Sequence, residues 1–154
     1  MHIVFIVGSY YPNYSAVGKC VGNIADELCQ RHTVTIICEK SNSNQLEFEQ
    51  FNNQRIFRVI SQDKIERENI VNSFIVGDGF KKKLKNFKMN VLKMQQACRL
   101  IFSKVTIKQD LVELYLSKLC EIDKEIDLII PASMPFESVV AASQYKKKFN
   151  SKVI

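Results

Sequence analysis

Two short apolar runs, separated by one amphipathic segment, constrain the fold of this chain more than any other feature of its sequence. The runs are HIVFIVG (residues 2–8) and TVTIICE (33–39). Unbroken apolar runs of this length, rich in β-branched residues, are typical of strands that are covered on both faces of a parallel sheet. The segment between them (18–32) repeats apolar residues at the spacing of one helix face: Val21, Ile24, Ala25 and Leu28. The pattern predicts a strand–helix–strand unit with a right-handed crossover.

The rest of the chain continues this alternation. Three later segments are expected to be strands: RIFRVIS (55–61), DLIIPAS (127–133) and KVI (152–154), the last of them cut off at its beginning. Three segments are expected to be helices: about 84–105, about 108–124, and 135–150 with Pro135 near its start. Residues 40–54 and 62–82 are polar or lack a clear period, so we expect loops there, or a short helix in the second. The alternation predicts an α/β fold, a Rossmann-like doubly wound parallel sheet with helices on both faces, in a single domain.

The composition is that of an ordinary soluble globular protein. The chain has 154 residues, enough for one domain with a real core, and 46% of them are hydrophobic and 25% charged. No apolar run approaches the roughly 20 residues that cross a bilayer. The N-terminal MHIVFIVG lacks the basic region and the cleavage site of a signal peptide, so we interpret it as a first strand.

The cysteines and histidines do not suggest a metal site. Five cysteines are an odd number, widely spaced and without a C-x-x-C pair, which argues against a zinc site and against a disulfide framework. His2 and His32 lie far apart in the sequence and have no acidic partner at ligand spacing. We therefore expect reduced thiols in a cytosolic protein, and no bound metal.

The stretch GSYYPNYSAVGKC (8–20) follows the first predicted strand and is the first candidate for a site. In a doubly wound sheet, ligands bind outside the carboxyl ends of the strands, near the point where the strand order reverses. Two loops qualify by position, 8–18 after the first strand and 131–136 after the fourth. Free N–H groups and the dipole at the start of the helix near Gly18 would favour an anion such as a diphosphate.

Two common phosphate-binding motifs do not fit this stretch. A triphosphate loop needs a glycine at the position of Asn13 and a serine or threonine at that of Cys20, and a thiol is a poor magnesium ligand. A dinucleotide fingerprint needs a second glycine where Tyr10 stands. We therefore expect neither a triphosphatase nor an ordinary dehydrogenase or reductase.

The stretch YYPNYSAVGKCVGNIADELCQRHTVTIICEK (10–40) resembles the opening of family-4 glycosyltransferases of the GT-B fold. The matching pieces are Pro12, Ser15-Ala16, Ile24-Ala25, Leu28, His32 and the VTII of the second strand. A second match is DLIIPASMPFESVVAA (127–142), which is similar to the fourth strand of the family and its loop into a helix of small residues. The resemblance covers roughly residues 1–40 and 125–154. Residues 41–124 match the family only in the alternation of their expected strands and helices.

The resemblance implies site residues as well as a fold. The backbone of the first loop is expected to lie near the donor diphosphate, at Ser15, Ala16, Val17 and Gly18. The first two of these stand where many members have two glycines. The acceptor-side candidates are Tyr10, Tyr11, Ser133 and Met134, and for the two tyrosines packing within the turn is an equal alternative. A histidine that some members use near the fourth strand is absent from IPASMP (130–135), so the catalytic residues stay unassigned.

The resemblance also implies what the whole protein does. Family-4 enzymes have two Rossmann-like domains, and the second binds most of the nucleotide-sugar. Residues 1–154 are therefore expected to be the N-terminal, acceptor-side half, ending in or after its fifth strand, without the C-terminal donor-binding domain and inactive alone. The full-length enzyme is expected to transfer a sugar from a nucleotide-sugar, with retention of configuration and no metal or other cofactor. Its acceptor is expected to be a lipid-linked molecule or a polysaccharide in bacterial surface glycan synthesis, in the cytoplasm or at the inner face of the plasma membrane.

A basic segment is the second informative feature. Residues 81–108 contain nine lysines and arginines and no acidic residue. Its apolar residues follow a helical spacing: Leu84, Phe87, Val91, Met94, Cys98 and Ile101. Such a helix suits an anionic membrane surface, for which the candidates are Lys81, Lys82, Lys83, Lys85 and Lys88. The alternative of equal weight is that the apolar stripe packs on the sheet and the lysines are merely solvated.

Two functions of different classes remain open at this point. One is the glycosyltransferase, and the other is a non-catalytic Rossmann-like module that binds a partner or an anionic membrane through the basic helix 81–108. Nucleic acid is not expected as a partner, although the isoelectric point is near 9.1. The basic segment has few aromatic residues for base stacking and no known binding motif.

Overall fold

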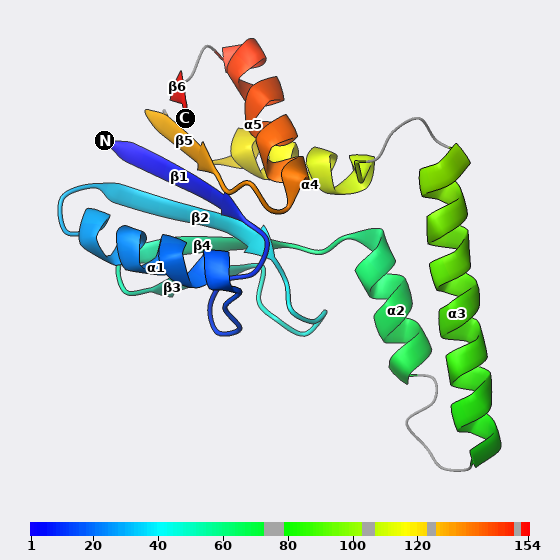
Figure 1. The fold of residues 1–154 in the computed structure, drawn as a ribbon. Helices are drawn as coiled ribbons and strands as arrows, with labels where there is room; N and C mark the ends of the chain where they lie inside the picture. The colour runs from blue at the N-terminus through cyan, green and yellow to red at the C-terminus, as the bar shows by residue number, and fades with distance from the viewer. Residues whose placement is uncertain (73–78, 103–106, 123–125, 150–151) are drawn as a thin grey trace. The chain divides into compact units, whose positions relative to one another are not determined.

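The computed structural model describes residues 1–72, 79–102, 107–122, 126–149 and 152–154 (Figure 1). A six-stranded sheet forms the centre of its larger compact unit, which comprises Met1–Ser61 and Gln109–Ile154. The strands, in chain order, are β1 (His2–Val7), β2 (Thr33–Glu39), β3 (Phe48–Phe51), β4 (Gln54–Val59), β5 (Leu128–Pro131) and β6 (Lys152–Val153). Their order across the sheet is β3-β4-β2-β1-β5-β6. Every neighbouring pair is parallel except β3 and β4. The chain therefore moves outward from β1 first to one side and then to the other, which is the doubly wound arrangement.

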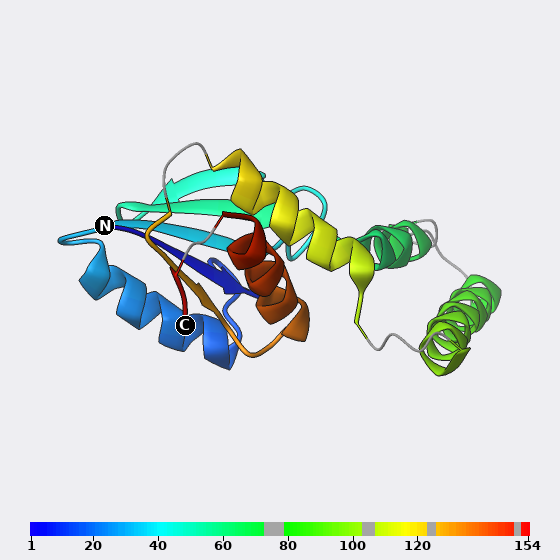
Figure 2. The same cartoon turned by 90° about the horizontal axis from the view of Figure 1, so that it is seen from above.

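Three helices cover the two faces of this sheet. Helix α1 (Ala16–Leu28) lies against one face, and α4 (Gln109–Glu121) and α5 (Phe136–Phe149) lie against the other, as Figure 2 shows. The Rossmann-like α/β fold predicted from the sequence is therefore confirmed. The five predicted strands are all present, and the predicted helices differ from the observed ones at their ends.

The unbroken apolar runs are explained by burial on both faces. All six residues of β1 are buried. Ile3, Phe5 and Val7 point to the face of α1, where they pack in one cluster with Ala25. The other face is covered by the buried residues of α4 and α5: Leu111, Val112, Tyr115, Leu119, Ser138, Ala141, Ala142 and Tyr145. A central strand of this kind has no solvent face, so its sequence does not alternate.

The prediction of a loop over residues 40–54 was wrong in part, because β3 lies within it. The strand pairs with β4 in an antiparallel hairpin closed by Asn52 and Asn53. Both asparagines have positive φ angles, 48° and 62°, as a two-residue hairpin turn of the primed type requires. Asparagine tolerates this conformation better than most residues. The strand itself, Phe48–Phe51, is a half-exposed edge strand, which is why it shows no apolar run.

Residues 62–82 were predicted to be a loop with a possible short helix, and the helix is present as α2 (Gln62–Asn72). Helix α3 (Gly79–Phe102) begins five residues before the predicted start at residue 84, so the loop prediction was wrong for residues 79–82. Helix α2 has no buried residue, so its sequence carries no apolar stripe that could have revealed it. The two helices belong to a compact unit of their own, Gln62–Lys108, within which Lys108 and Asp63 form an ion pair at 3.6 Å. Of the described helices, none combines the length and the apolar character that a bilayer span requires.

Candidate functional site

The carboxyl ends of β1 and β5 bring the two predicted ligand loops together. The first loop runs from Gly8 to Ser15, and the second from Ala132 to Pro135. They touch at Gly8, where a Cβ atom would lie 2.9 Å from Cδ of Pro135. Each loop is also fixed to a neighbouring strand, since the Gly8 carbonyl accepts from the Glu39 N–H at 2.8 Å and the Ala132 N–H donates to the Ile6 carbonyl at 2.8 Å. The sheet topology therefore places both loops at one edge, as the sequence predicted.

The first loop ends in a capped helix. Oγ of Ser15 accepts a hydrogen bond from the backbone N–H of Gly18 at 3.0 Å, which makes Ser15 the N-cap of α1. The helix therefore begins at Ala16, two residues earlier than predicted. Because the Gly18 amide is occupied by this cap, the first-turn amides that a diphosphate would meet are those of Ala16 and Val17. Of the four residues whose backbone was predicted to lie near the donor diphosphate, Ser15 to Gly18, these two therefore remain as the first-turn donors.

The charge around this helix start favours an anion. The first turn of α1 contains no acidic residue, and Lys19 follows it with an exposed side chain. Helices α2, α4 and α5 differ, since they carry Asp63, Asp110 and Glu137 in their first turns, whereas α3, like α1, has no acidic residue there. A carboxylate at that position neutralises the positive end of a helix. At α1 the positive end is uncompensated by its own first turn.

Gly18 has a packing role that explains its place in the sequence. A Cβ atom at this position would lie only 2.0 Å from the carbonyl oxygen of Ser9, so no larger residue fits without moving the loop. The Ser15 hydroxyl also approaches the Ser9 carbonyl, at 3.4 Å. The close approach of loop and helix thus explains why residue 18 is a glycine. This glycine is therefore no evidence for a triphosphate loop, which the sequence had already disfavoured.

Tyr10 anchors the first loop to the protein core. Its side chain is buried, and its hydroxyl donates to Oε1 of Gln54 at 2.6 Å. Gln54 in turn donates through Nε2 to Oδ1 of Asp26 at 2.7 Å, which ties the loop to β4 and to α1. Burial raises the pKa of Tyr10, with the neighbouring Tyr14 and Asp26 acting in the same direction. Of the two alternatives left open for Tyr10, this geometry favours packing over a place in an acceptor pocket.

Tyr11 is half-buried in an aromatic cluster. Its ring stacks on that of Phe51, with the centroids 3.9 Å apart and an angle of 18° between the planes. Tyr14 lies edge-on to Tyr10 with the centroids 5.1 Å apart, and it is 41% exposed. Tyr14 is therefore the more accessible tyrosine of this loop, although the sequence had singled out Tyr10 and Tyr11.

Arg58 is a site residue that the sequence analysis missed. It lies on β4 with 2% of its surface exposed. Its guanidinium donates to the Tyr11 carbonyl at 2.9 Å, to the Leu46 carbonyl at 3.3 Å and to Oε2 of Glu49 at 2.6 Å. A charged residue in the middle of the apolar run RIFRVIS was the available signal, because a buried charge has to be paired.

The second loop exposes two of the predicted acceptor-side residues. Ser133 and Met134 are both exposed, and 70% of Met134 is accessible. The loop is held from within by Ser138, a fully buried serine whose hydroxyl bonds to the carbonyls of Ala132 and Pro135. Sequence reasoning did not find Ser138, since a serine inside a helix is usually solvated. The exposed pair is thus presented on a fixed backbone.

The membrane-surface candidates lie in the other compact unit. Lys88 lies on α3 with an exposed side chain. Lys81, Lys82, Lys83 and Lys85 belong to the same helix, but their side chains lie outside the described part of the structure. In the part of the chain that is described, no three His, Cys, Asp or Glu side chains come together as a metal site requires. Independence from metal stays a prediction.

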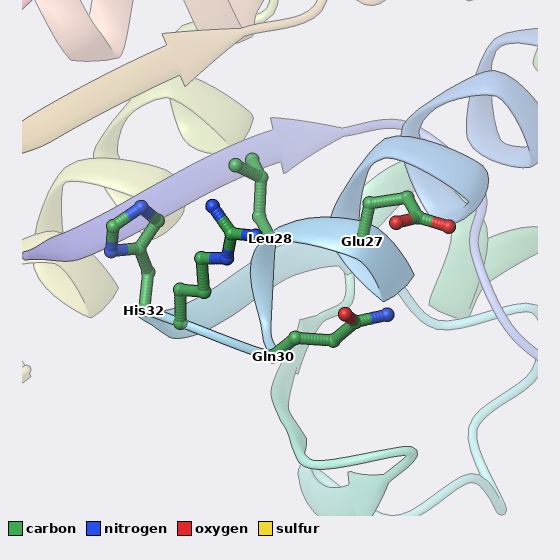
Figure 3. Close-up of a pocket in the computed structure, with 5 residues that line it drawn as sticks. Glu27, Leu28, Gln30 and His32 are labelled. Carbon is green, nitrogen blue, oxygen red and sulfur yellow. The ribbon is translucent and has the colours of Figure 1, made fainter.

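The surface also carries a pocket remote from these loops. It is lined by Glu27, Leu28, Gln30, Arg31 and His32 at the end of α1 and the turn into β2 (Figure 3). That turn precedes the amino end of β2, whereas the two ligand loops follow the carboxyl ends of β1 and β5. The pocket therefore lies at the opposite end of the strands and is not part of the candidate site.

Comparison with known proteins adds one finding on the fold. No protein-family model matches the chain, and no curated protein shows significant similarity to it. Among solved structures, it is similar to sucrose-phosphate synthase from Thermosynechococcus elongatus, with a TM-score of 0.50 and 12% sequence identity over 99% of this chain. The likeness is one of fold, between this chain and part of a glycosyltransferase structure. The chain covers 31% of the length of that synthase, so the comparison concerns one part of a longer enzyme.

Proposed function

We propose that this chain is the acceptor-side half of a GT-B glycosyltransferase related to family 4, and that the whole enzyme transfers a sugar from a nucleotide-sugar. The observation that carries the proposal is the start of α1, where the amides of Ala16 and Val17 open a helix without an acidic first turn. The glycosyltransferase-like fold supports it, and so does the name of the structural neighbour, a sucrose-phosphate synthase.

The chemistry assigned to this half is electrostatic. The leaving group of the reaction is a nucleoside diphosphate, and negative charge grows on it as the bond to the sugar breaks. Backbone N–H groups at a helix N-terminus stabilise such charge without a metal ion. In our proposal the amides of Ala16 and Val17 serve this purpose, Ser15 fixes them by its cap, and Lys19 adds positive charge nearby.

The acceptor would approach from the second loop. Ser133 and Met134 are exposed in this loop, which contacts Gly8 of the first loop through Pro135. We propose a glycan or a lipid-linked molecule as the acceptor, in bacterial surface glycan synthesis on the cytoplasmic side of the membrane. Retention of configuration and the absence of a cofactor are further parts of this proposal, and all of them rest on the family resemblance of residues 10–40 and 127–142. No side chain of this half is assigned as catalytic.

The experiment is a turnover assay with the protein expressed from its complete gene. The protein is incubated with a panel of UDP- and GDP-sugars, and the release of nucleoside diphosphate is measured. Ala16→Asp tests the helix start, because a carboxylate in the first turn stabilises the helix but repels a diphosphate. We expect it to lower kcat/KM by at least about tenfold, the effect of about 1.4 kcal/mol.

Asn23→Asp is the matched control. It adds the same charge at an exposed position two turns further along α1, so it should change kcat/KM by less than about twofold. Release of nucleoside diphosphate that depends on Ala16 but not on Asn23 supports the proposal. Turnover of no nucleotide-sugar, or an equal loss in both variants, contradicts it.

The alternative is a non-catalytic Rossmann-like module that binds a partner or a membrane. The exposed apolar side chains of α3 favour it, because they belong to the compact unit Gln62–Lys108, whereas the proposed site belongs to the other unit. The turnover assay separates the two functions, because a module of this kind releases no nucleoside diphosphate.

A further inference from the structure

Helix α3 exposes a row of large apolar side chains. Leu84, Phe87, Met94 and Ile101 are 40%, 65%, 62% and 76% exposed, and we call these four residues the apolar row. They were predicted to form one stripe of the helix, and the sequence left open whether that stripe is buried. In the structure the four side chains are exposed. Four such residues in line are unlike the single exposed apolar side chains that any protein surface carries.

Most of the apolar row lies away from the covered side of α3. Leu92 is buried and marks the side of α3 that is covered. At 3.6 residues per turn, Phe87, Met94 and Ile101 lie about 140–180° around the helix from Leu92, and Leu84 lies about 80° from it. Three of the four residues of the apolar row are therefore roughly opposite the covered side of α3, and Leu84 lies between the two sides.

The net charge of the chain is concentrated in this same unit. Residues 62–108 contain 11 lysines and arginines and 4 aspartates and glutamates, a net charge of +7, whereas the whole chain has +6. The sheet domain is therefore close to neutral. On α3 itself, the exposed Lys88 and Lys93 lie about 100–120° around the helix from the centre of the apolar row, one on each side of it.

We propose that the apolar row of α3 docks on the surface of an anionic lipid bilayer. A helix that lies in the interface buries its apolar face at the boundary of the acyl chains and keeps its basic flanks at the level of the headgroups. The exposed apolar row and the basic flanks match these two requirements. The positive charge selects anionic lipid over neutral lipid, and lysine stems are long enough to reach the headgroups from the flanks. This inference does not depend on the proposed sugar transfer, since it concerns a different unit of the chain.

The first experiment uses the absence of tryptophan from the chain. Phe87→Trp places a single fluorescent reporter in the apolar row, and Ile24→Trp places the matched reporter on α1, where Ile24 is 52% exposed. Both variants of the chain are titrated with vesicles of phosphatidylglycerol and phosphatidylcholine, and with vesicles of phosphatidylcholine alone. We expect a blue shift and quenching by brominated acyl chains for residue 87 with the anionic vesicles. No such change is expected for residue 24.

The second experiment uses vesicle co-sedimentation to separate the contribution of the apolar side chains from that of the lysines. Phe87→Ser and Ile101→Ser should each weaken binding by about tenfold, because each removes a large side chain from the apolar phase. Lys88→Glu combined with Lys93→Glu should weaken it by more than about tenfold at low salt. The controls are Ile24→Ser, and Lys146→Glu combined with Lys147→Glu on α5, where both lysines are exposed. Circular dichroism of each variant checks that the helices are retained.

Two results would overturn the proposal. If the chain forms a dimer in light scattering, and Phe87→Ser makes it monomeric without any binding to anionic vesicles, the apolar row is a contact between two copies. If the chain binds nucleic acid but not anionic vesicles, the basic flanks serve a different partner. A blue shift at residue 87 with anionic vesicles, lost in Lys88→Glu with Lys93→Glu but kept in the α5 control, supports the proposal.

Discussion

The guanidinium of Arg58 donates to the main-chain carbonyl of Tyr11 at 2.9 Å, so a buried charge on β4 holds the first loop of the chain from a distance of 47 residues. The same guanidinium pairs with Glu49 on β3 at 2.6 Å. One side chain therefore holds both the β3–β4 hairpin, through Glu49, and the first loop, through Tyr11. The geometry of the candidate site therefore depends on the edge strand β3 in two ways, through the Arg58–Glu49 ion pair and through the stacking of Tyr11 on Phe51.

Replacing Arg58 should destabilise the protein more than any exposed substitution. Arg58→Met leaves Glu49 and two carbonyls without their donor, and we expect a loss of about 2–4 kcal/mol in the free energy of unfolding. Arg58→Lys should be intermediate, since an ammonium cannot reach three acceptors in fork geometry. Urea denaturation measures both. Arg55→Ala on the same strand is the control. Among the described residues, the side chain of Arg55 has a cation–π contact with Phe57 at 5.5 Å and no ion pair, so its loss should cost less than about 1 kcal/mol. Equal losses for Arg55 and Arg58 would show that Arg58 has no special role.

Gly18 and Gly22 of α1 should respond in opposite ways to alanine. At Gly18 the new Cβ would stand 2.0 Å from the Ser9 carbonyl oxygen, so the first loop must move, at a cost of about 1–3 kcal/mol. At Gly22 the nearest atoms, on Tyr10 and Tyr14, are 3.4 Å away, so the higher helix propensity of alanine should give a neutral result or a gain of up to about 1 kcal/mol. Thermal unfolding of both variants checks the pair. A stable Gly18→Ala would mean that the loop is not packed on the helix as described.

Tyr10 and Tyr115 are both buried, but only the first has a hydrogen-bond partner in the described structure. Tyr10→Phe removes the bond to Gln54 and leaves the Oε1 atom of that residue without its donor, so we expect a loss of about 1–3 kcal/mol. The hydroxyl of Tyr115 is buried without a partner among the described residues, so Tyr115→Phe should be neutral or slightly stabilising. The difference between the two urea midpoints is the test, and the opposite order would contradict the hydrogen bonding described here.

Stability should fall at alkaline pH because of the same two residues. Burial raises the pKa of both Tyr10 and Tyr115 above the ordinary value of 10.0. Since the unfolded chain releases these protons first, their contribution to stability is complete below pH 10 and is lost as the pH rises further, by about 1.4 kcal/mol per pH unit for each tyrosine. Tyr115→Phe should therefore flatten the fall above pH 10. An unchanged slope in this variant would show that Tyr115 titrates normally.

The sequence was sufficient for the central part of the fold because its signals there are local. The apolar runs of β1 and β2 and the apolar stripe of α1 each span only a short segment of the chain. Burial of both faces of the sheet explains all three patterns. The edge strand β3 was missed because it buries little, and α2 could be predicted only as a possible short helix because it buries nothing. Periodicity reports burial, so elements with little burial leave no pattern to read.

The sequence was likewise sufficient for only part of the candidate site. The two loops were placed correctly from the order of the elements, since ligand loops follow the carboxyl ends of parallel strands. The sequence left the roles of Tyr10 and Tyr11 open, because they depend on contacts with residues far along the chain: Tyr10 with Gln54, 44 residues away, and Tyr11 with Arg58. The cap by Ser15 is local, and the pattern of a serine before a helix would have been enough to find it.

The central claim is that the start of α1 binds the diphosphate of a nucleotide-sugar, and amide NMR tests it most directly. The chain is labelled with 15N and titrated with UDP, GDP and inorganic pyrophosphate. The account predicts saturable shifts of the amides of Ala16 and Val17, weakened in Ala16→Asp and kept in Asn23→Asp. Shifts confined to the pocket of Glu27, Leu28, Gln30, Arg31 and His32, or no saturable shift at the start of α1, would contradict it.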